Sequence, residues 1–557
     1  MSKKIFIILF SFTLALAFVL RFWHLGSTPS GLDWDEASLG YNAYSILQTG
    51  KDEYGTFLPI VLRSFDDYKP VLYTYLSIPF IAIFGLTEFA VRFPSALIGV
   101  VTVFATYFFI KELMSMFYVG LKNENLYAKY LPLLVSFFLA ISPWHIQFSR
   151  VAFEASVGMS FNIFSSLFFL KGLRKPWFLF LSTIFLALNM YVYQSEKVFS
   201  PLLFFALIFI FRKNLQKISR KYLIVSVVVG LIILLPFVRT TLTSRDTLAR
   251  AKGVSILSGK TSFLERNVLK LNWDKEMNDV AGLILDNRRI AYGNAIIAGY
   301  LSHFDLNWLF ISGDYNANRH HAPNMGLLYI FELPLLIIGF YQLLFSDLDK
   351  RAKILIYSWF FIAPVPAAAT IDIPHAVRTL NFLPMFQIFT ACGVIYVFNS
   401  LFTYKFKILL FLLAILFFVI NFSYFFNQYF VQQDYLNSAD WQYGYKDLIS
   451  YVKPIQKNYA KIIVSDTMDF DQSYMFFLFY LKYDPKKYIN EGGSNARLLF
   501  GGKKFSNFEF RKFDYQNEKQ KNVLFVGSPE DFPVSYKAIK IVNYLDGKLG
   551  RIIAEVE

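Results

Sequence analysis

The sequence predicts a polytopic α-helical membrane protein with a small extracytoplasmic α/β domain at its C-terminal end. Apolar residues make up 55% of the 557 residues and charged residues only 17%, and the mean hydropathy is +0.41. Runs such as Phe6 to Leu20, Tyr222 to Phe237 and Ile408 to Val419 are nearly free of charge. Because about 20 apolar residues cross the hydrocarbon core of a bilayer, such runs are candidate transmembrane helices.

The first apolar run begins after Lys3 and Lys4 and continues to Trp23. A cleaved signal peptide has a shorter apolar region, so we expect this segment to remain as the first span. The single cysteine, Cys392, lies inside a later apolar run, which excludes an intrachain disulfide. The formal net charge of +15 is spread over short loops, so we interpret it as a topology signal and not as a nucleic-acid-binding surface.

Basic loops alternate with longer and more acidic loops along the chain. Because lysine and arginine in short loops favour the cytoplasmic side, this alternation predicts a cytoplasmic N-terminus. The predicted outer segments are 23–90, 146–155, 194–197, 239–325, 370–378 and everything after about 427. The assignment uses about eleven transmembrane helices in a multi-pass protein of the cell membrane. The spans are expected near residues 5–22, 92–110, 130–145, 156–170, 176–193, 198–211, 222–238, 326–345, 354–369, 379–398 and 406–426.

This topology requires that the apolar stretch 71–86 does not cross the membrane, since an extra crossing would place every later basic loop outside. Pro70, Pro79 and Gly85 make the stretch a poor straight helix. We therefore interpret it as an interfacial or re-entrant element at the outer surface. The alternative is an ordinary span that compensates for a miscounted span elsewhere.

The chain divides into a predicted transmembrane domain at 1–426 and a predicted extracytoplasmic α/β domain at 427–557. In the second part, short strands are expected at Lys461–Val464 and Asn522–Gly527, with a helix over Tyr474–Tyr483 between them. A terminal hairpin over 538–544 and 551–556 is expected to turn at Asp546-Gly547. The segment has no Gly-rich phosphate loop, no metal-spaced His/Cys cluster and no nucleophile elbow, so we expect it to support assembly or acceptor docking.

Charged residues gather in the predicted outer loops. The most acidic group is Asp33-Trp34-Asp35-Glu36, about ten residues beyond the first span. Charged side chains at the membrane surface next to a span cost free energy, so such a cluster indicates a binding or catalytic role. The spans themselves hold few ionisable groups. Glu332 is the main exception, and we expect it either to line a lipid-phosphate cavity or to bond to a neighbouring helix.

This distribution suits a reaction at the outer membrane surface with one substrate supplied by lipid. Transfer of a sugar from a polyprenyl phosphate to a hydroxyl or amine needs a carboxylate that accepts the proton of the acceptor. It also needs cations that hold the phosphate as its bond to the sugar breaks. In-line attack assisted by one base inverts the anomeric carbon. The base candidates are Asp33, Asp35 and Glu36, and the phosphate-binding candidates are Lys69, Arg92, Arg150 and Arg378.

Several motifs resemble the dolichyl-phosphate-mannose–protein mannosyltransferase family. This family belongs to the glycosyltransferase C superfamily, which includes the bacterial aminoarabinose transferase that modifies lipid A. The resemblance covers roughly 5–400 and is strongest over 31–100. The matching motifs are Asp35-Glu36, Tyr68-Lys69-Pro70, Val91-Arg92-Phe93-Pro94-Ser95-Ala96-Leu97, Ser142-Pro143 with Ser149-Arg150 and Glu154, and Arg378 with Leu383-Pro384. The chain lacks a large lumenal insert of the MIR type, since 239–325 is too short to hold one.

The resemblance implies that Asp35 is the catalytic base and that Lys69 contacts the lipid phosphate. Glu36 is a second catalytic candidate that could instead orient the base or bind the acceptor, while Asp33 is expected to be structural. For Asp35 and Glu36 the alternative is a helix-capping acidic turn, and for Lys69 it is a lysine that snorkels at the interface. The remaining donor-binding candidates are Arg150, Glu154, His375 and Arg378. Arg150 and Glu154 could instead pair across one helical turn, and Arg378 could anchor the end of a span.

Four residues of the long outer loop are candidates for acceptor binding or loop packing: His303, Arg319, His320 and His321. A metal site at His320-His321 beside Asp314 is less favoured, because adjacent histidines rarely point the same way. A divalent cation such as Mg²⁺ or Mn²⁺ that bridges Asp35 and Glu154 with the lipid phosphate would suit their hard oxygen ligands. That question is open at the level of the sequence.

The function that these patterns and the resemblance together predict is that of an inverting glycosyltransferase. It would move a monosaccharide from a polyprenyl-phosphate donor to a hydroxyl or amine of a lipid, glycan or protein. One alternative is a ligase or polymerase of lipid-linked oligosaccharides, which would use a pyrophosphate donor. The other is a lipid or sugar transporter, for which internal repeats or charges at mid-membrane would be expected.

Overall fold

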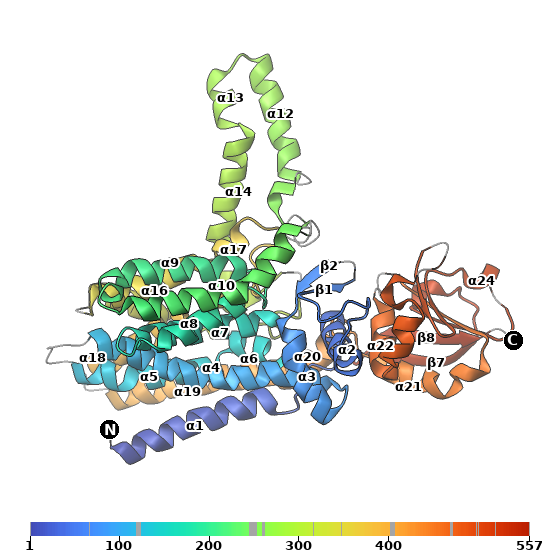
Figure 1. Ribbon diagram of the computed structural model, residues 1–557, viewed down its shortest axis with the longest axis horizontal. Coiled ribbons are helices and arrows are strands. Elements are labelled where there is room, and N and C mark those ends of the chain that lie inside the picture. The colour runs from blue at the N-terminus through green and yellow to red at the C-terminus, as the bar shows by residue number, and fades with distance from the viewer. Residues whose placement is uncertain are drawn as a thin grey trace.

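The computed structural model describes residues 2–555 apart from 66, 118–123, 244–252, 259–261, 316, 347, 402–406, 468–471, 497, 499–500 and 519. Parts of the predicted loop 239–325 and the first residue of the predicted span 406–426 therefore lie outside the described residues. The chain forms a bundle of helices that run roughly side by side, with a mixed sheet at one end of the bundle (Figure 1). The N-terminus lies at the opposite end of the bundle from that sheet (Figure 1).

The bundle consists of apolar helices from both halves of the chain. They are α1 (Lys3–Phe22), α4 (Glu88–Phe117), α5 (Glu124–Ile141), α6 (Pro143–Arg150), α7 (Glu154–Gly172), α8 (Phe178–Asn189), α9 (Glu196–Leu215), α10 (Arg220–Thr243), α15 (Glu332–Phe345), α16 (Lys350–Ile362), α18 (Met385–Leu401) and α19 (Lys407–Asn427). Short helices α17 (Val365–Ala368), η3 (Trp308–Ser312) and η4 (Leu380–Phe382) join them. A helix was therefore correctly predicted at each of the eleven proposed spans.

The number of membrane crossings is a separate question from the number of helices. Among the described residues, six helices are long and apolar enough to cross a membrane, and the pair Lys129–Ile141 and Pro143–Arg150, bent by 57°, would make seven. The helices α8, α15 and α16 have only 12, 14 and 13 residues. Short or polar helices in such a bundle are stabilised by packing and need no uniformly apolar surface. The count of eleven crossings is not confirmed.

The stretch predicted not to cross the membrane forms helix α3 (Leu72–Phe84), which follows the antiparallel pair β1 (Val61–Ser64) and β2 (Asp67–Pro70). Its 13 residues extend about 20 Å, less than the roughly 30 Å of the hydrocarbon core. Tyr73 and Ile81 are buried, whereas Ile83 is 71% exposed. A short helix with one buried face fits the interfacial interpretation, which remains a prediction.

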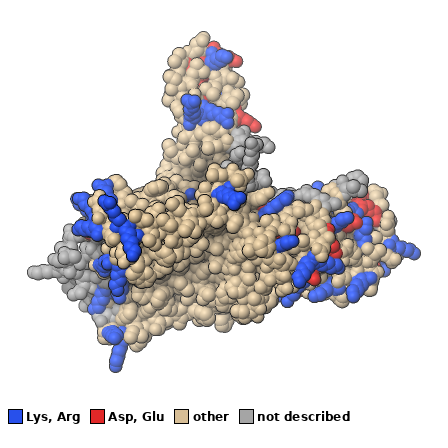
Figure 2. Space-filling model, viewed as in Figure 1, with Lys and Arg blue, Asp and Glu red and all other residues tan. Residues whose placement is uncertain are grey.

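Basic side chains gather at the end of the bundle that lies opposite the sheet, and few charges lie along the middle of the bundle on the face seen in Figure 2. This separation is the arrangement expected when one end of the bundle faces the cytoplasm. The direction of the chain in the membrane remains a prediction.

The C-terminal part contains a six-stranded sheet in the order β4-β5-β3-β6-β8-β7. The strands are β3 (Lys461–Val464), β4 (Lys503–Phe505), β5 (Phe508–Phe510), β6 (Val523–Gly527), β7 (Ala538–Asn543) and β8 (Leu549–Glu555), with helices α21 (Tyr445–Ile455), α22 (Ser473–Leu481), α23 (Pro485–Asn490), α24 (Tyr515–Glu518), η6 (Gln456–Asn458), η8 (Gly493–Asn495) and η9 (Pro529–Asp531). Strand β3 is parallel to β5 and β6, and the other pairs are antiparallel. The predicted strands, helix and hairpin are all present, and Gly547 in the hairpin turn has φ +87°.

Helix α2 (Trp34–Thr49) lies between the bundle and the sheet region, as Figure 1 shows. Gly40 allows this approach, since a Cβ there would lie 2.6 Å from Val91 and 2.7 Å from Phe479. Glu53, which is fully buried, also joins α2 to the sheet region. Its carboxylate accepts hydrogen bonds from Asn42, Tyr474 (3.2 Å) and Ser494.

The segment after α19 packs on the first outer loop. It contains η5 (Gln428–Gln432) and α20 (Gln433–Leu436). The Thr28 hydroxyl donates to Asp434 over 2.8 Å, and Tyr429 lies under the guanidinium of Arg150. These residues therefore contact the bundle side, although they belong to the predicted C-terminal domain 427–557.

Part of the segment 239–325, predicted to be an outer loop, forms an arm that projects away from the bundle (Figure 1). Its helices are α12 (Ser262–Glu276), α13 (Val280–Leu285) and α14 (Arg288–Ser302), and the short η2 (Ile256–Ser258) precedes them. Leu269, Trp273 and Ile284 on the arm are 68%, 63% and 61% exposed. The loop residues that reach the acidic motif come after this arm.

We expect Glu53→Ala to weaken the contact between α2 and the sheet region. The change leaves the buried donors of Asn42, Tyr474 and Ser494 without their acceptor, which should cost about 1–3 kcal/mol or more. The melting temperature in detergent should fall, and limited proteolysis should release C-terminal fragments sooner. Glu530→Ala, at an exposed position, is the matched control; equal behaviour of the two variants would contradict this prediction.

Candidate active site

The acidic motif forms the first turn of α2. Asp33 is the N-cap, and its carboxylate accepts from the backbone N–H of Asp35. Glu36 reaches back to the backbone N–H of Asp33 over 3.1 Å, which completes a capping box. The backbone N–H of Trp34 donates to Gln442 from the C-terminal part of the chain. The helix-capping acidic turn, which was the alternative to a catalytic role for Asp35 and Glu36, is therefore present. Within this turn the carboxylates of Asp33, Asp35 and Glu36 each have a different environment.

Glu36 is buried in an ion pair with Arg92 of α4. Arg92 Nε and Nη2 each donate to one oxygen of the Glu36 carboxylate over 2.9 Å. The backbone N–H of Ala152, between α6 and α7, donates to the same carboxylate over 2.9 Å. Arg92 also donates to the carbonyls of Pro29 and Gly31. Both charges are fully bonded, so the geometry favours Glu36 as a positioning residue and removes Arg92 as a free phosphate ligand.

Asp35 is the most exposed of the three carboxylates, with 33% of its side chain accessible. Lys69 at the end of β2 donates from Nζ to Asp35 Oδ1, and its own side chain is only 6% accessible. The Lys69 ammonium also lies 4.8 Å from the centre of the Phe65 ring. The structure thus brings together the predicted base and the predicted phosphate-binding lysine, which are 34 residues apart.

Asp33 connects the motif to the second long outer loop. Its carboxylate forms an ion pair with Arg319 Nη1 at 2.5 Å, and the Arg319 guanidinium lies 4.2 Å from the centre of the Trp34 ring. Burial raises the pKa of Asp33 to about 6, against the opposing effect of Arg319. Arg319 therefore packs on the acidic motif.

Arg150 and Glu154 flank the linker between α6 and α7. Arg150 is buried and donates to the carbonyl oxygens of Leu20 and Thr28. Glu154, the first residue of α7, is 8% exposed. Burial and the nearby carboxylates of Glu36 and Glu154 raise the pKa of Tyr73 well above its ordinary value. Glu154 therefore lies near the acidic motif, whereas Arg150 ties the first outer loop to the bundle.

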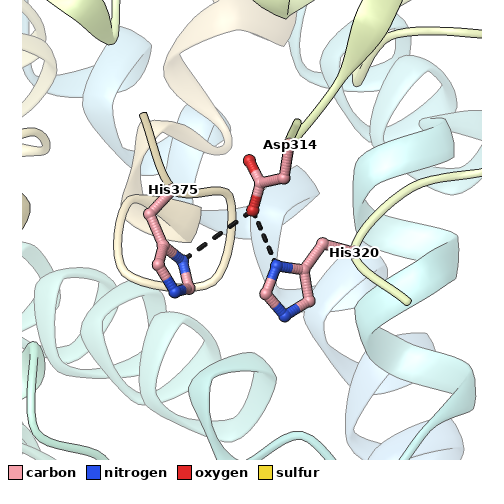
Figure 3. A group of neighbouring side chains, drawn as sticks. All are labelled: Asp314, His320 and His375. Carbon is pink, nitrogen blue, oxygen red and sulfur yellow. Dashed lines mark hydrogen bonds and ion pairs between the residues drawn. The ribbon is translucent and has the colours of Figure 1, made fainter. Parts of the chain in front are cut away.

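His320 and His375, from the predicted outer loops 239–325 and 370–378, converge on Asp314 (Figure 3). His320 Nδ1 lies 2.7 Å from Asp314 Oδ2, and His375 Nδ1 lies 3.9 Å from the same oxygen. His303 Nε2 accepts from the backbone N–H of His375. The ring nitrogens of His321 lie near backbone oxygens instead, Nδ1 near the carbonyl of Ala322 and Nε2 near that of Asp314.

The environment of this histidine group shifts the pKa values of His303, Asp314 and His375. Burial lowers the pKa of His303 to about 4. The hydrogen bond from His320 and the nearby imidazoles lower the pKa of Asp314 to about 2, although burial opposes this. Burial and the neighbouring His320 and Arg378 lower the pKa of His375 well below its ordinary value. Asp314 is therefore ionised and His375 neutral near pH 7.

Arg378 and Glu332 form hydrogen bonds to neighbouring protein groups. Arg378 donates to the Thr370 hydroxyl over 2.7 Å and to the carbonyl of Ile371. Glu332 accepts from the Thr390 hydroxyl of α18 over 3.1 Å. Of the two roles considered for Glu332, the structure shows the bond to a neighbouring helix.

Glu196 was missed as a buried carboxylate because its sequence position suggested a short outer loop. It begins α9 and accepts from Asn162 over 2.6 Å and from Asn381 over 2.7 Å. Asn189 and Ser200 complete a buried polar network around it. The only sequence signal was the set of asparagines inside otherwise apolar helices, which does not indicate that they meet.

No protein-family model matches the sequence, and comparison with the curated proteins gives no match. Solved structures share its fold. ArnT from Cupriavidus metallidurans bound to undecaprenyl phosphate has a TM-score of 0.56 at 10% identity, over 99% of this chain and 98% of that one. The archaeal oligosaccharyltransferase AglB from Archaeoglobus fulgidus, in complex with an inhibitory peptide and a dolichol-phosphate, has a TM-score of 0.51 at 11% identity, over 94% and 69%. The glycosyltransferase C type of fold is therefore confirmed.

We expect Glu36→Ala to destabilise the protein strongly, because it leaves the buried Arg92 guanidinium without its carboxylate. Breaking one side of a buried pair costs about 3–5 kcal/mol. Asp372→Asn, which changes an exposed carboxylate of another loop, should change the melting temperature in detergent little. A Glu36→Ala protein as stable as Asp372→Asn would show that the pair does not hold the site together.

Asp33 is expected to make the stability depend on pH. Its pKa rises from an ordinary 3.8 to about 6 on folding, so the folded state binds this proton more tightly than the unfolded chain. Protonated Asp33 therefore adds about 3 kcal/mol to the free energy of unfolding below pH 4. This stabilisation is lost as the pH rises through 6. Asp33→Asn keeps an N-cap and should flatten the dependence of the melting temperature between pH 4 and 7.

The control for this measurement is Asp372→Asn, which changes an exposed carboxylate of another loop. It should leave the pH dependence of the melting temperature as in the unmodified protein. If Asp33→Asn also leaves the pH dependence of the melting temperature unchanged, burial does not raise the pKa of Asp33 to about 6.

Proposed function

We propose that this protein is an inverting glycosyltransferase that moves a monosaccharide from a polyprenyl-phosphate donor to a hydroxyl or amine acceptor at the outer face of the cell membrane. The contact of Lys69 with Asp35 carries this proposal. It places a partly exposed carboxylate beside a buried cation at the end of a bundle with the glycosyltransferase C fold. Base and phosphate ligand are the two parts that the reaction needs.

In the proposed reaction, Asp35 accepts the proton of the acceptor hydroxyl or amine as that atom attacks the anomeric carbon. The bond from that carbon to the phosphate oxygen breaks on the opposite side, so the carbon is inverted. The electron pair stays on the lipid phosphate, whose additional negative charge Lys69 stabilises. The phosphate leaves without a general acid.

The neighbouring charges prepare Asp35 for this role. Lys69 donates a hydrogen bond to the Asp35 carboxylate and so orients it. Glu36 and Arg92 fix the first turn of α2, and Asp33 with Arg319 fixes the adjoining loop. We assign Glu36 a positioning role, and His375, Arg378 and Glu154 remain candidates for contact with the donor.

The ligands of the two solved structures support the proposed donor class. One holds undecaprenyl phosphate and the other a dolichol-phosphate. Both are polyprenyl phosphates, and each is bound in a protein with this fold. The acceptor is proposed only by class, as a lipid, a glycan or a protein.

We propose that the cell membrane holds the bundle, with the N-terminus in the cytoplasm and residues 427–557 outside. In this orientation α2, Asp35 and the sheet region share the outer side, at the end of the bundle opposite the basic cluster beside the N-terminus; the sheet region itself carries both basic and acidic side chains (Figure 2). The sheet region packs directly on α2, which suits a role in supporting the site or receiving the acceptor.

Asp35→Asn should slow sugar transfer about 10²- to 10⁴-fold, because it removes the base but keeps the shape of the side chain. The measurement incubates the purified protein with radiolabelled polyprenyl-phosphate sugars and a membrane extract, and counts labelled product. Asp372→Asn, an exposed carboxylate in another outer loop, should retain full transfer.

Undiminished transfer by Asp35→Asn would remove Asp35 as the base. Transfer from a pyrophosphate-linked donor but from no monophosphate would instead favour a ligase or polymerase of lipid-linked oligosaccharides. Movement of labelled lipid or sugar across vesicles without any covalent product would favour a transporter.

A further inference from the structure

We propose that the groove between α9, α15 and α16 binds one anionic phospholipid, with the lipid phosphate at Lys350 and Lys353 and one acyl chain along the groove. Helix α9 packs against α16 in the bundle (Figure 1). Ala206 of α9 and Phe340 of α15 line the groove, and α16 lines it along its length from Lys350 onwards. Lipid binding is measurable without a sugar donor, so this inference goes beyond the proposed transfer reaction.

The groove is large enough for part of a lipid. Its volume is about 790 Å³, within the roughly 300–1,000 Å³ that ligand sites have. Its walls are mostly apolar, and three of the residues that line it, Leu344, Ile354 and Phe361, are 45%, 50% and 46% exposed. Apolar walls without neighbouring atoms lose dispersion contacts. An acyl chain from the surrounding membrane would supply these contacts.

Two aromatic side chains give the groove a defined shape. The Tyr357 hydroxyl of α16 donates to the carbonyl of Phe340 over 2.6 Å. The rings of Tyr357 and Phe340 lie 4.9 Å apart, edge to face. The hydroxyl is therefore bonded to the backbone of α15. The floor of the groove between α15 and α16 is thus held by direct contacts and is present before any lipid binds.

The length of the groove matches one leaflet of a bilayer. Helix α16 has 13 residues and rises about 18 Å from its first residue to its last. Half of the hydrocarbon core of a bilayer is roughly 15 Å thick. A phospholipid with its headgroup at one end of α16 therefore fits the groove, whereas a polyprenyl chain is much longer than the groove.

The charged end of the groove is suited to a phosphate. Lys353 Nζ donates to the carbonyls of Leu344 and Ser346 at the end of α15, over 3.1 and 2.9 Å. An ammonium has three N–H donors, so a third can bind a phosphate oxygen. Lys350, the first residue of α16, adds a second positive charge. The carboxylate between these segments, Asp349, is bonded to Arg351.

The position of the two lysines separates this site from the proposed site of sugar transfer. The other end of α16 leads through α17 to His375, which lies beside Asp314 in the candidate active site. Lys350 and Lys353 therefore lie toward the opposite end of the bundle, where basic side chains gather (Figure 2). Basic pockets between transmembrane helices bind the headgroups of anionic lipids. The phosphate of a sugar donor, which belongs beside Asp35, does not reach these lysines.

The test uses the purified full-length protein, delipidated in detergent and titrated with phosphatidylglycerol or with phosphatidylcholine of the same acyl chains. Native mass spectrometry should show one tightly held phosphatidylglycerol per chain, and the melting temperature should rise more with phosphatidylglycerol than with phosphatidylcholine. The double variant Lys350→Gln/Lys353→Gln should bind phosphatidylglycerol about 25-fold more weakly, since each lysine near an anionic headgroup contributes about a factor of five. Lys175→Gln, which changes an exposed lysine between α7 and α8, should bind as the unmodified protein does.

A second pair of variants tests the groove itself. Ala206→Phe fills the groove and should weaken the binding of both lipids, whereas Ala414→Phe, at an exposed position of α19, should not. Equal binding of the two lipids by the unmodified protein, or equal binding of phosphatidylglycerol by the unmodified protein and Ala206→Phe, would overturn the proposal. So would displacement of phosphatidylglycerol from the groove by a polyprenyl phosphate. Each of these results is obtained without sugar transfer, so it leaves the proposed reaction untouched.

Discussion

The buried ion pair between Glu36 and Arg92 is the constraint on which the rest of the site depends. Two charges without water cost several kcal/mol per ion unless every donor and acceptor is bonded. Here the bonds come from the backbone of the first outer loop, from α2 and α4, and from the linker at Ala152. These segments can satisfy the pair only in one arrangement, so the pair determines where the first turn of α2 lies.

The three carboxylates of one helical turn differ because their environments differ. Glu36 points into the bundle and is bound by Arg92, whereas Asp33 caps the helix and meets Arg319. Asp35, between them, faces outward and contacts Lys69 with a third of its side chain accessible. A carboxylate that is both ionised and accessible is what proton transfer requires. The capping box and the proposed base therefore belong to the same turn of α2.

The sequence predicted the helices and strands whose formation depends on the local pattern of apolar and turn residues. Apolar runs predicted helices at all eleven proposed spans, short apolar runs predicted the buried strands β3 and β6, and the turn at Asp546-Gly547 predicted the final hairpin. The strands β4 and β5 were missed, since three residues carry too little periodicity. Pairings between distant segments were also beyond the sequence, such as Asp33 with Arg319 or Asp314 with His375. The family resemblance indicated Asp35 and Lys69, but only packing shows that Arg92 and Arg150 are held by other protein groups.

Helix α2 is restrained by both the bundle and the sheet region, and this bears on what the sheet region contributes. Val91 and the Glu36–Arg92 pair join it to the bundle. Phe479, which lies beside Val91 at Gly40, and Gln442, which accepts from the N–H of Trp34, join it to the C-terminal part of the chain. A helix that is restrained only by the bundle could tilt about its first turn and move Asp35 away from Lys69. Because transfer requires the base within hydrogen-bond reach of the acceptor, a tilt of even 1 Å would be costly. The sheet region therefore contributes to the geometry of Asp35 through α2, without any of its residues entering the contact between Asp35 and Lys69.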